Sequence, residues 1–311
     1  MATVAEVARS LLASTTSDAG LVLATRWIGE RFAELTGSHR FKSLRRVDEF
    51  VVPSIIATGT VSIALDSQTV TGNAAAQAAW ANQGLAGRFF KADDYLYEID
   101  AQTTANTLRL KSPYAEATVA DGTYEIFKRF HKLHPDARWI GTMTLDRRAL
   151  DRVSIATLDY NAPGRRADRE RPVLFAEVGN SADGRKQVEV YPLPSTDAVL
   201  VRYVFWPKPV RLKQSDTIPT FIDPSVLKEG ALVDLCQFEM TRALRTGSVE
   251  PASVWRNEAR AQRTSWEVAK RDAIRADRGS DDVELILAHG RSSADRDITT
   301  AYDEVVTRHA L

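Results

Sequence analysis

The sequence predicts an α+β protein in which helical segments from both ends of the chain form one bundle and β structure is inserted between them. Three observations predict this class. Apolar residues recur at helical spacing before residue 50 and again between residues 220 and 278. Between these stretches, period-two alternation, threonines and glycine-containing turns are typical of short strands. Because helices precede and follow the strands, we expect a helical bundle at 1–50 and 220–278 with β insertions projecting from it.

Two helices are predicted at the N-terminal end. The first has one apolar face, made by Val4, Val7, Ala8, Leu11 and Leu12. Ser17 and Asp18 are residue types that cap a second helix. That helix would carry a stripe of Ala24, Ile28, Phe32 and Leu35 with Trp27 nearby, and Gly37 would end it.

Residues 51–130 predict an inserted small antiparallel β-barrel or sandwich. Its strands are short and numerous, and Asp66–Ser67 and Asp121–Gly122 supply turn residues. The expected strands are Gly59–Leu65, Thr69–Thr71, Arg88–Phe90, Tyr95–Asp100, Thr107–Leu110 and Tyr124–Phe130.

Residues 131–219 predict a more irregular region that ends in β-hairpins. Trp139–Leu145 and Val153–Leu158 are short candidate strands, and the charged segment Ala162–Arg171 is an expected exposed loop. Clearer strands follow, with Asp-Gly turn chemistry between the first two: Val173–Val178, Gln187–Tyr191 and Val199–Trp206.

Two further helices are predicted near the C-terminal end. Asp223–Pro224 combines a capping residue with proline at the first helical position, and Gly247 would end that helix. A second helix would begin at Glu250–Pro251 and run to about Arg278. Trp255 and Trp266 are eleven residues apart, so they would face the same side of it.

Residues 279–311 predict an extended C-terminal arm that docks on a partner. The segment is too polar to build its own core, apart from one short apolar run. The expected docking residues are Val283, Leu285, Ile286 and Leu287.

Composition limits the possible functions. Lys and Arg together number 41, as do Asp and Glu, so the formal net charge is zero. A protein that binds polyanions over its whole surface is therefore not expected, but zero net charge does not exclude a local basic patch. The single cysteine, Cys236, cannot form an internal disulfide. The N-terminus lacks the pattern of a signal peptide and no apolar run could span a bilayer, so we expect folding in a cytoplasm.

No catalytic, cofactor-binding or metal-binding site is predicted. His131 and His134 are three residues apart without other ligands nearby in the sequence, which favours a polar strand end over a metal site. Cys236 is expected in the helical core. The acidic pairs Asp93–Asp94 and Asp281–Asp282 are expected on the surface, and phosphate-binding loops and nucleophile elbows are absent. The aromatic residues of the strands are expected to be core, and they are Phe89, Phe90, Tyr95, Tyr97 and Phe205.

The sequence contains a series of short motifs whose order is characteristic. Within the β module their residues are Gly59, Thr60, Val61, Thr69, Val70, Thr71, Gly72, Trp80, Gly87, Arg88, Phe89, Phe90, Tyr97, Ile99, Leu108, Leu110, Pro113, Tyr114, Tyr124 and Ile126. Outside the module they include Trp27, Glu189–Pro194, Arg202–Pro207 and Ile218–Pro219. In this order, over about residues 20–275, the chain resembles the head-to-tail adaptors, the tail-tubular-like neck proteins of tailed bacteriophages.

The resemblance implies a structural protein of the virion neck. It implies a ring, commonly of twelve copies, that joins the portal to the tail nozzle or next neck protein and helps to seal the channel through which DNA passes without sequence-specific contacts. The Ala-rich segment Asn73–Gln83 and the tail after Gly279 depart from the family pattern. The alternatives are another neck or tail-completion protein, a tail receptor- or carbohydrate-binding protein, and a tail-associated hydrolase, which would need a cleft with paired carboxylates.

Overall fold

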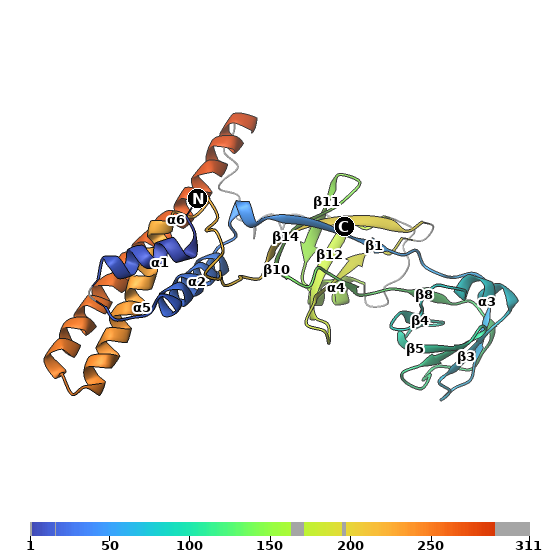
Figure 1. Cartoon of the computed structure of the whole chain (residues 1–311). Helices are drawn as coiled ribbons and strands as arrows, with labels where there is room; N and C mark the ends of the chain where they lie inside the picture. The colour runs from blue at the N-terminus through green and yellow to red at the C-terminus, as the bar shows by residue number, and fades with distance from the viewer. Residues whose placement is uncertain (1, 16, 163–170, 195–196, 290–311) are drawn as a thin grey trace. The chain divides into compact units, whose positions relative to one another are not determined.

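The computed structural model describes residues 2–15, 17–162, 171–194 and 197–289 (Figure 1). They form two compact units, a helical unit of residues 1–44 with 209–311 and a β unit of residues 45–208. The α+β class is confirmed, and both ends of the chain contribute to the helical unit.

Among its described residues the helical unit has four α-helices, and the small 3-10 helix η1 (Lys42–Leu44) follows the second of them. The four are α1 (Val4–Ala13), α2 (Leu21–Ser38), α5 (Pro224–Arg245) and α6 (Val249–His289). They share one hydrophobic core, to which the N-terminal helices contribute Leu11 and Ile28 and the C-terminal helices Leu227, Leu235 and Trp266. This core brings together residues that are more than 200 positions apart in the sequence.

Helix α5 begins and ends where the sequence predicts, and α6 begins one residue before its predicted start. Asp223 caps α5 by accepting a hydrogen bond from the backbone N–H of Ser225 at 2.9 Å. Gly247 follows α5 with a φ of 72°, and the N–H groups of Gly247 and Ser248 close a Schellman motif on the carbonyls of Leu244 and Ala243. The chain then turns back into α6, which packs against α5.

Both predicted ends of α2 are wrong. Gly20, not Ser17 or Asp18, is the N-cap of α2, because the Ser17 hydroxyl bonds the Glu239 carboxylate and Asp18 pairs with Arg242 on α5. Helix α2 continues past Gly37 to Ser38, whose hydroxyl bonds the carbonyl of Leu35.

The predicted extended arm is also partly helical. The backbone of α6 continues through Gly279 to His289, since one glycine costs only about 1 kcal/mol within a helix. Residues 290–311 lie outside the described residues, as does most of the loop predicted at Ala162–Arg171.

The described part of the β unit contains two seven-stranded sheets. The first has the order β1-β14-β10-β11-β12-β13-β9, and only the β11–β12 pair is parallel among its pairings. Its strands are β1 (Arg46–Val52), β9 (His131–Lys132), β10 (Ala137–Leu145), β11 (Arg148–Val153), β12 (Leu174–Asn180), β13 (Lys186–Tyr191) and β14 (Val199–Pro207). The short helix α4 (Ile155–Asn161) follows β11.

This sheet corrects two predictions. Residues 46–50 do not belong to the helical bundle, nor residues 51–52 to the β module, because β1 pairs along its whole length with β14. Residues 153–158 are mostly the start of α4, which Ser154 caps by accepting a hydrogen bond from the N–H of Thr157. The region predicted as irregular therefore forms a regular sheet, to which the upstream strand β1 also belongs.

The second sheet forms the predicted β module and is antiparallel throughout. Its order is β7-β2-β3-β6-β5-β4-β8. The strands are β2 (Val61–Ile63), β3 (Thr69–Gly72), β4 (Phe89–Lys91), β5 (Tyr97–Thr104), β6 (Thr107–Leu110), β7 (Val119–Gly122) and β8 (Glu125–Phe127). Sequence analysis missed β7 and also the helix α3 (Ala74–Trp80), which occupies the Ala-rich segment.

Trp80 is the centre of the β module. Its side chain is fully buried, and its indole N–H donates to the Tyr124 hydroxyl at 2.9 Å, which donates in turn to the Thr58 carbonyl at 2.7 Å. A Cβ atom at Gly72 would lie 2.5 Å from Cη2 of the Trp80 ring. Glycine at position 72 is therefore required for the tryptophan to pack.

Gly72→Ala should destabilise the β unit by about 1–3 kcal/mol, because the added methyl group overpacks against a rigid ring. Thermal unfolding followed by tryptophan fluorescence measures the loss. Ala78→Ser, an exposed change on α3, is the control and should leave the melting temperature nearly unchanged. An unchanged melting temperature in Gly72→Ala would contradict this packing.

Candidate assembly site on the helical unit

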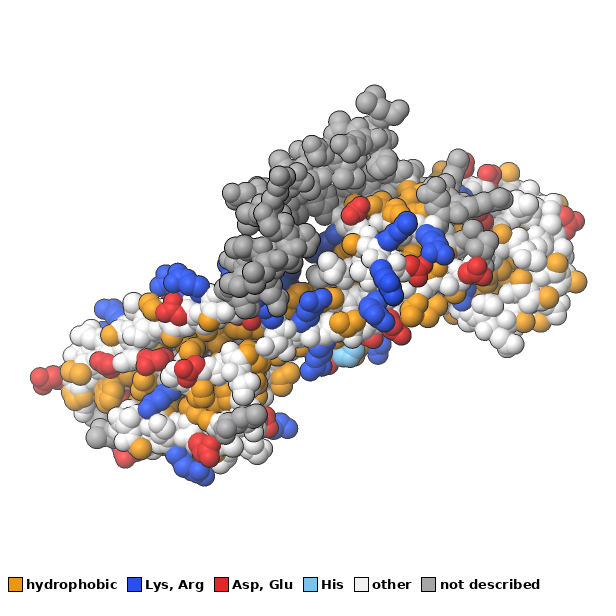
Figure 2. Space-filling view, turned by 90° about the horizontal axis from the view of Figure 1, so that it is seen from above, with side chains coloured by type: hydrophobic (Ala, Val, Ile, Leu, Met, Phe, Trp, Pro, Cys, Tyr) orange, Lys and Arg blue, Asp and Glu red, His pale blue; other side chains and the backbone are white. Residues whose placement is uncertain are grey.

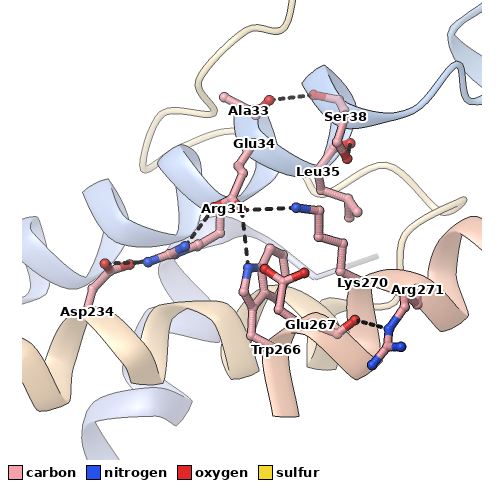
Figure 3. Close-up of polar contacts among 11 residues, drawn as sticks. Arg31, Ala33, Glu34, Leu35, Ser38, Asp234, Trp266, Glu267, Lys270 and Arg271 are labelled. Carbon is pink, nitrogen blue, oxygen red and sulfur yellow. Dashed lines mark hydrogen bonds and ion pairs between the residues drawn. The ribbon is translucent and has the colours of Figure 1, made fainter. Parts of the chain in front are cut away.

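A network of charged side chains joins α2 to α5 and α6 (Figure 3). The Arg31 guanidinium donates two hydrogen bonds to Asp234, at 2.8 Å from Nε and 2.6 Å from Nη2. Its Nη1 donates to Glu34 at 2.7 Å. From α6, Lys270 Nζ and Trp266 Nε1 reach the same Glu34 carboxylate at 3.2 and 3.4 Å. One arginine thus links the two ends of the chain.

Most of this network is less exposed to solvent than a surface ion pair. The side chains of Arg31, Asp234 and Lys270 are only 17–18% exposed. Burial alone would raise the pKa of Glu34, but the Arg31 charge and the bonds from Lys270 and Trp266 outweigh it and lower that pKa. Burial likewise opposes the charge of Arg31, whereas Asp234 and Glu34 raise its pKa. Glu34 and Arg31 therefore stay ionised near neutral pH.

A second link fixes α6 to the end of α2. The His39 ring nitrogen Nε2 lies 2.8 Å from Oδ2 of Asp277, and the Lys42 backbone N–H donates to the same carboxylate at 3.1 Å. The side chains of His39 and Asp277 are each 12% exposed. These contacts hold α6 eleven residues beyond Trp266, so the helix is anchored at two points on one side.

A groove with an estimated volume of about 410 Å³ lies between α2 and α5, next to the network. Leu23, Trp27 and Phe238 supply its hydrophobic lining, and the Trp27 and Phe238 rings are 5.9 Å apart. Its polar lining comes from α5 and consists of Asp234, Gln237, Thr241, Arg242 and Arg245. Figure 2 shows exposed hydrophobic side chains lying among charged ones on the helical unit. Such a mixed surface suits a protein partner.

The groove shares residues with the contacts that hold the helices together. Asp234 belongs to both the groove and the network. Arg242 pairs with Asp18 at 2.6 Å and with Glu239 at 3.7 Å. The walls of the groove are therefore held by ionic contacts within the unit.

The structure also locates the residues that sequence analysis considered for chemistry. His131 lies in the short strand β9, where it is buried and stacks on Phe50 with the ring centres 5.1 Å apart. Burial, with the charge of Lys128, lowers the pKa of His131 to about 3, so the ring is neutral. His134 stacks on Phe205. Cys236 is buried as predicted, and burial raises the pKa of its thiol to about 11.

The other predicted residues fall into three groups. Asp93 and Asp94 are exposed, as predicted. The aromatic residues Phe90, Tyr97 and Phe205 are buried, whereas Phe89 is half-buried and Tyr95 is 65% exposed. Asp281, Asp282 and the expected docking residues Val283, Leu285, Ile286 and Leu287 lie on the helical backbone of α6, but their side chains lie outside the described residues.

Within the described residues, no group of three or more His, Cys, Asp or Glu side chains is placed to hold a metal ion. No helix in the same part of the chain is both long and apolar enough to cross a membrane.

Arg31, Asp234 and the groove were missed by sequence analysis. Arg31 and Asp234 are 203 residues apart, and each resembles an ordinary charged residue on an amphipathic helix. No family model matches the sequence, and no curated protein sequence is significantly similar to it.

Asp234→Ala should lower the free energy of unfolding of the helical unit by about 2 kcal/mol, because it leaves the largely buried Arg31 with half of its partners. Urea unfolding followed by far-UV circular dichroism measures this loss. Asp272→Ala removes a carboxylate that is 63% exposed and 3.6 Å from Arg275, and should change stability by less than about 0.5 kcal/mol. Equal effects of the two substitutions would show that the network adds no more than a surface pair.

Glu34→Gln should make the stability of the helical unit less sensitive to acid. The lowered pKa of Glu34 means that its contribution is present above the ordinary value of 4.5 and is lost as the pH falls through the folded value. Unfolding free energies measured from about pH 6 to pH 3 should fall less steeply in the variant than in the native protein. Glu267→Gln, which removes an exposed carboxylate on α6, serves as the control, and an identical slope for all three proteins would refute the role of Glu34.

Proposed function

We propose that the chain is a structural head-to-tail adaptor of a tailed bacteriophage, forming a ring that joins the portal to the tail. The observation that carries the proposal is the topology of the chain. Segments from both ends of the sequence build one helical unit, and residues 45–208 between them form the β unit as a single insertion. This order fits the family that the β module resembles, and it lets the β unit reach a neighbour without interrupting the helical core.

In this proposal the protein acts by binding other proteins and catalyses no reaction. Closed rings need heterologous interfaces, in which one surface of a subunit meets a different surface of the next. The groove between α2 and α5 supplies one such surface, with a hydrophobic lining for a neighbour's apolar side chain. Arg245 at its edge is exposed and suited to a carboxylate beside that side chain. We assign this groove to a second copy of the chain.

The end of α6 is proposed to meet the portal. At about 1.5 Å per residue, the 41 residues of α6 span about 62 Å, against about 33 Å for the 22 residues of α5. Helix α5 therefore cannot cover the C-terminal part of α6. Val283, Leu285, Ile286 and Leu287 lie there and are the proposed portal contacts.

Electron microscopy of the purified chain mixed with portal rings tests the proposed function. The expected result is an additional ring of density on one face of the portal, with twelve copies where the portal has twelve subunits. The same chain lacking residues 280–311 should remain folded and fail to bind. Full binding by the truncated chain would remove the arm from the proposal, and failure of the intact chain to bind any portal tested would remove the adaptor function.

Filling the groove should prevent ring formation. Thr241 is exposed and lines the groove, so Thr241→Trp occupies it without disturbing the core. The expected result is a folded monomer in mass photometry under conditions in which the native chain forms rings on the portal. Val22→Trp places the same side chain at a position on α2 that is 76% exposed and outside the groove lining, and should assemble normally. Normal assembly of Thr241→Trp would contradict the assignment of the groove.

A further inference from the structure

Helix α6 carries a row of arginines beside the face that packs against the helical core. The buried and half-buried face includes Ala252, Trp255, Ala259, Trp266 and Ala273. At about 100° per residue, six arginines fall within a single sector of about 120° that begins beside this face and extends to the solvent side. This arginine row consists of Arg256, Arg260, Arg263, Arg271, Arg275 and Arg278.

All six side chains are exposed, and almost none of their charge is neutralised within the described part of the chain. Arg275 lies 3.6 Å from Asp272, which is its ion-pair partner. Arg271 donates from Nε to the backbone carbonyl of Glu267 at 3.1 Å, a bond that leaves its charge in place. Figure 3 shows Arg271 directed away from the network, whereas Trp266 and Lys270 point toward it. The row is therefore available to an external anion.

The row is long and nearly free of acids. From Arg256 to Arg278 it spans about 33 Å of helix. Glu267 is the one acid in the sector, because Glu258 and Asp272 lie on other sides of the helix. Duplex DNA carries about one negative charge per 1.7 Å of its axis, so several phosphates lie within reach of such a row.

The composition of the row favours a nucleic-acid backbone over a protein surface. Protein interfaces have an apolar centre from which charges are depleted. Here the other residues of the sector are Asn257, Thr264, Glu267 and Ile274, and Ile274 packs on the helical core. Val268, which is 43% exposed, lies just outside the sector. The row thus offers guanidinium groups and no hydrophobic anchor.

We propose that this row binds the phosphate backbone of duplex DNA without reading its sequence. The inference deepens the proposed function, since an adaptor ring surrounds the DNA that passes through it. The zero net charge of the chain provides no overall electrostatic attraction for DNA, so binding depends on the row itself and on salt. With six phosphate contacts, the logarithm of the binding constant should fall against the logarithm of salt concentration with a slope of about −5.

Fluorescence anisotropy with labelled 30-base-pair duplexes tests the proposal on the full chain, using two duplexes of unrelated sequence. Both should bind with the same affinity at about 50 mM salt and about a thousandfold more weakly at 200 mM. The triple variant R256Q/R260Q/R263Q should bind at least about tenfold more weakly at the lower salt, with a slope reduced by about half. Glutamine has nearly the helix propensity of arginine, so α6 should be retained, which circular dichroism verifies.

The matched control is R9Q/R147Q/R148Q, which removes the same charge from exposed arginines outside α6. It should bind DNA as the native chain does. Equal weakening in both triple variants, or no binding by the native chain at low salt, would overturn the inference. Unchanged DNA binding by the row variant together with lost portal or ring assembly would also overturn it and would assign the row to an acidic protein surface. Portal binding distinguishes the two proposals, because a chain that forms rings but does not bind DNA loses only this inference.

Discussion

The helical unit depends on the charged contact between Arg31 and Asp234. This contact joins α2 near the N-terminal end of the chain to α5 near the C-terminal end, across 203 residues of sequence. Glu34 extends this contact to Lys270 and Trp266 on α6, so one cluster fixes α2, α5 and α6 at once. Hydrophobic burial holds the same helices together, but it does not fix their alignment as a bidentate ion pair does. The walls of the groove and the exposed side of α6 both follow from that alignment.

The sequence predicted the features that depend on neighbouring residues. Asp223–Pro224 and Gly247 mark the ends of α5, since capping needs only residues close in the chain. Ser17 was predicted as a helix cap from its neighbouring residues, but its hydroxyl donates a hydrogen bond to the carboxylate of Glu239 on α5 instead. Strand β1 was missed because its partner β14 lies about 150 residues downstream.

In the candidate site, too, only the features that depend on neighbouring residues could be predicted. Burial of Cys236 could be predicted from its place on an amphipathic helix. The role of Arg31 could not be predicted. An arginine on the polar face of a helix has the same surrounding sequence whether its side chain faces solvent or a carboxylate from a distant segment. The buried Trp80 and its close approach to Gly72 explain why the β module needs a glycine there, which the resemblance alone left without a physical reason.

We propose that the helical unit, with its network and groove, is where the chain meets its partners. Hydrogen–deuterium exchange of the intact chain, free and mixed with portal rings, is the measurement that decides this. We expect slower exchange on assembly in peptides that cover α2, α5 and the C-terminal part of α6. Protection confined to residues 46–207, with the helical peptides unchanged, would contradict it.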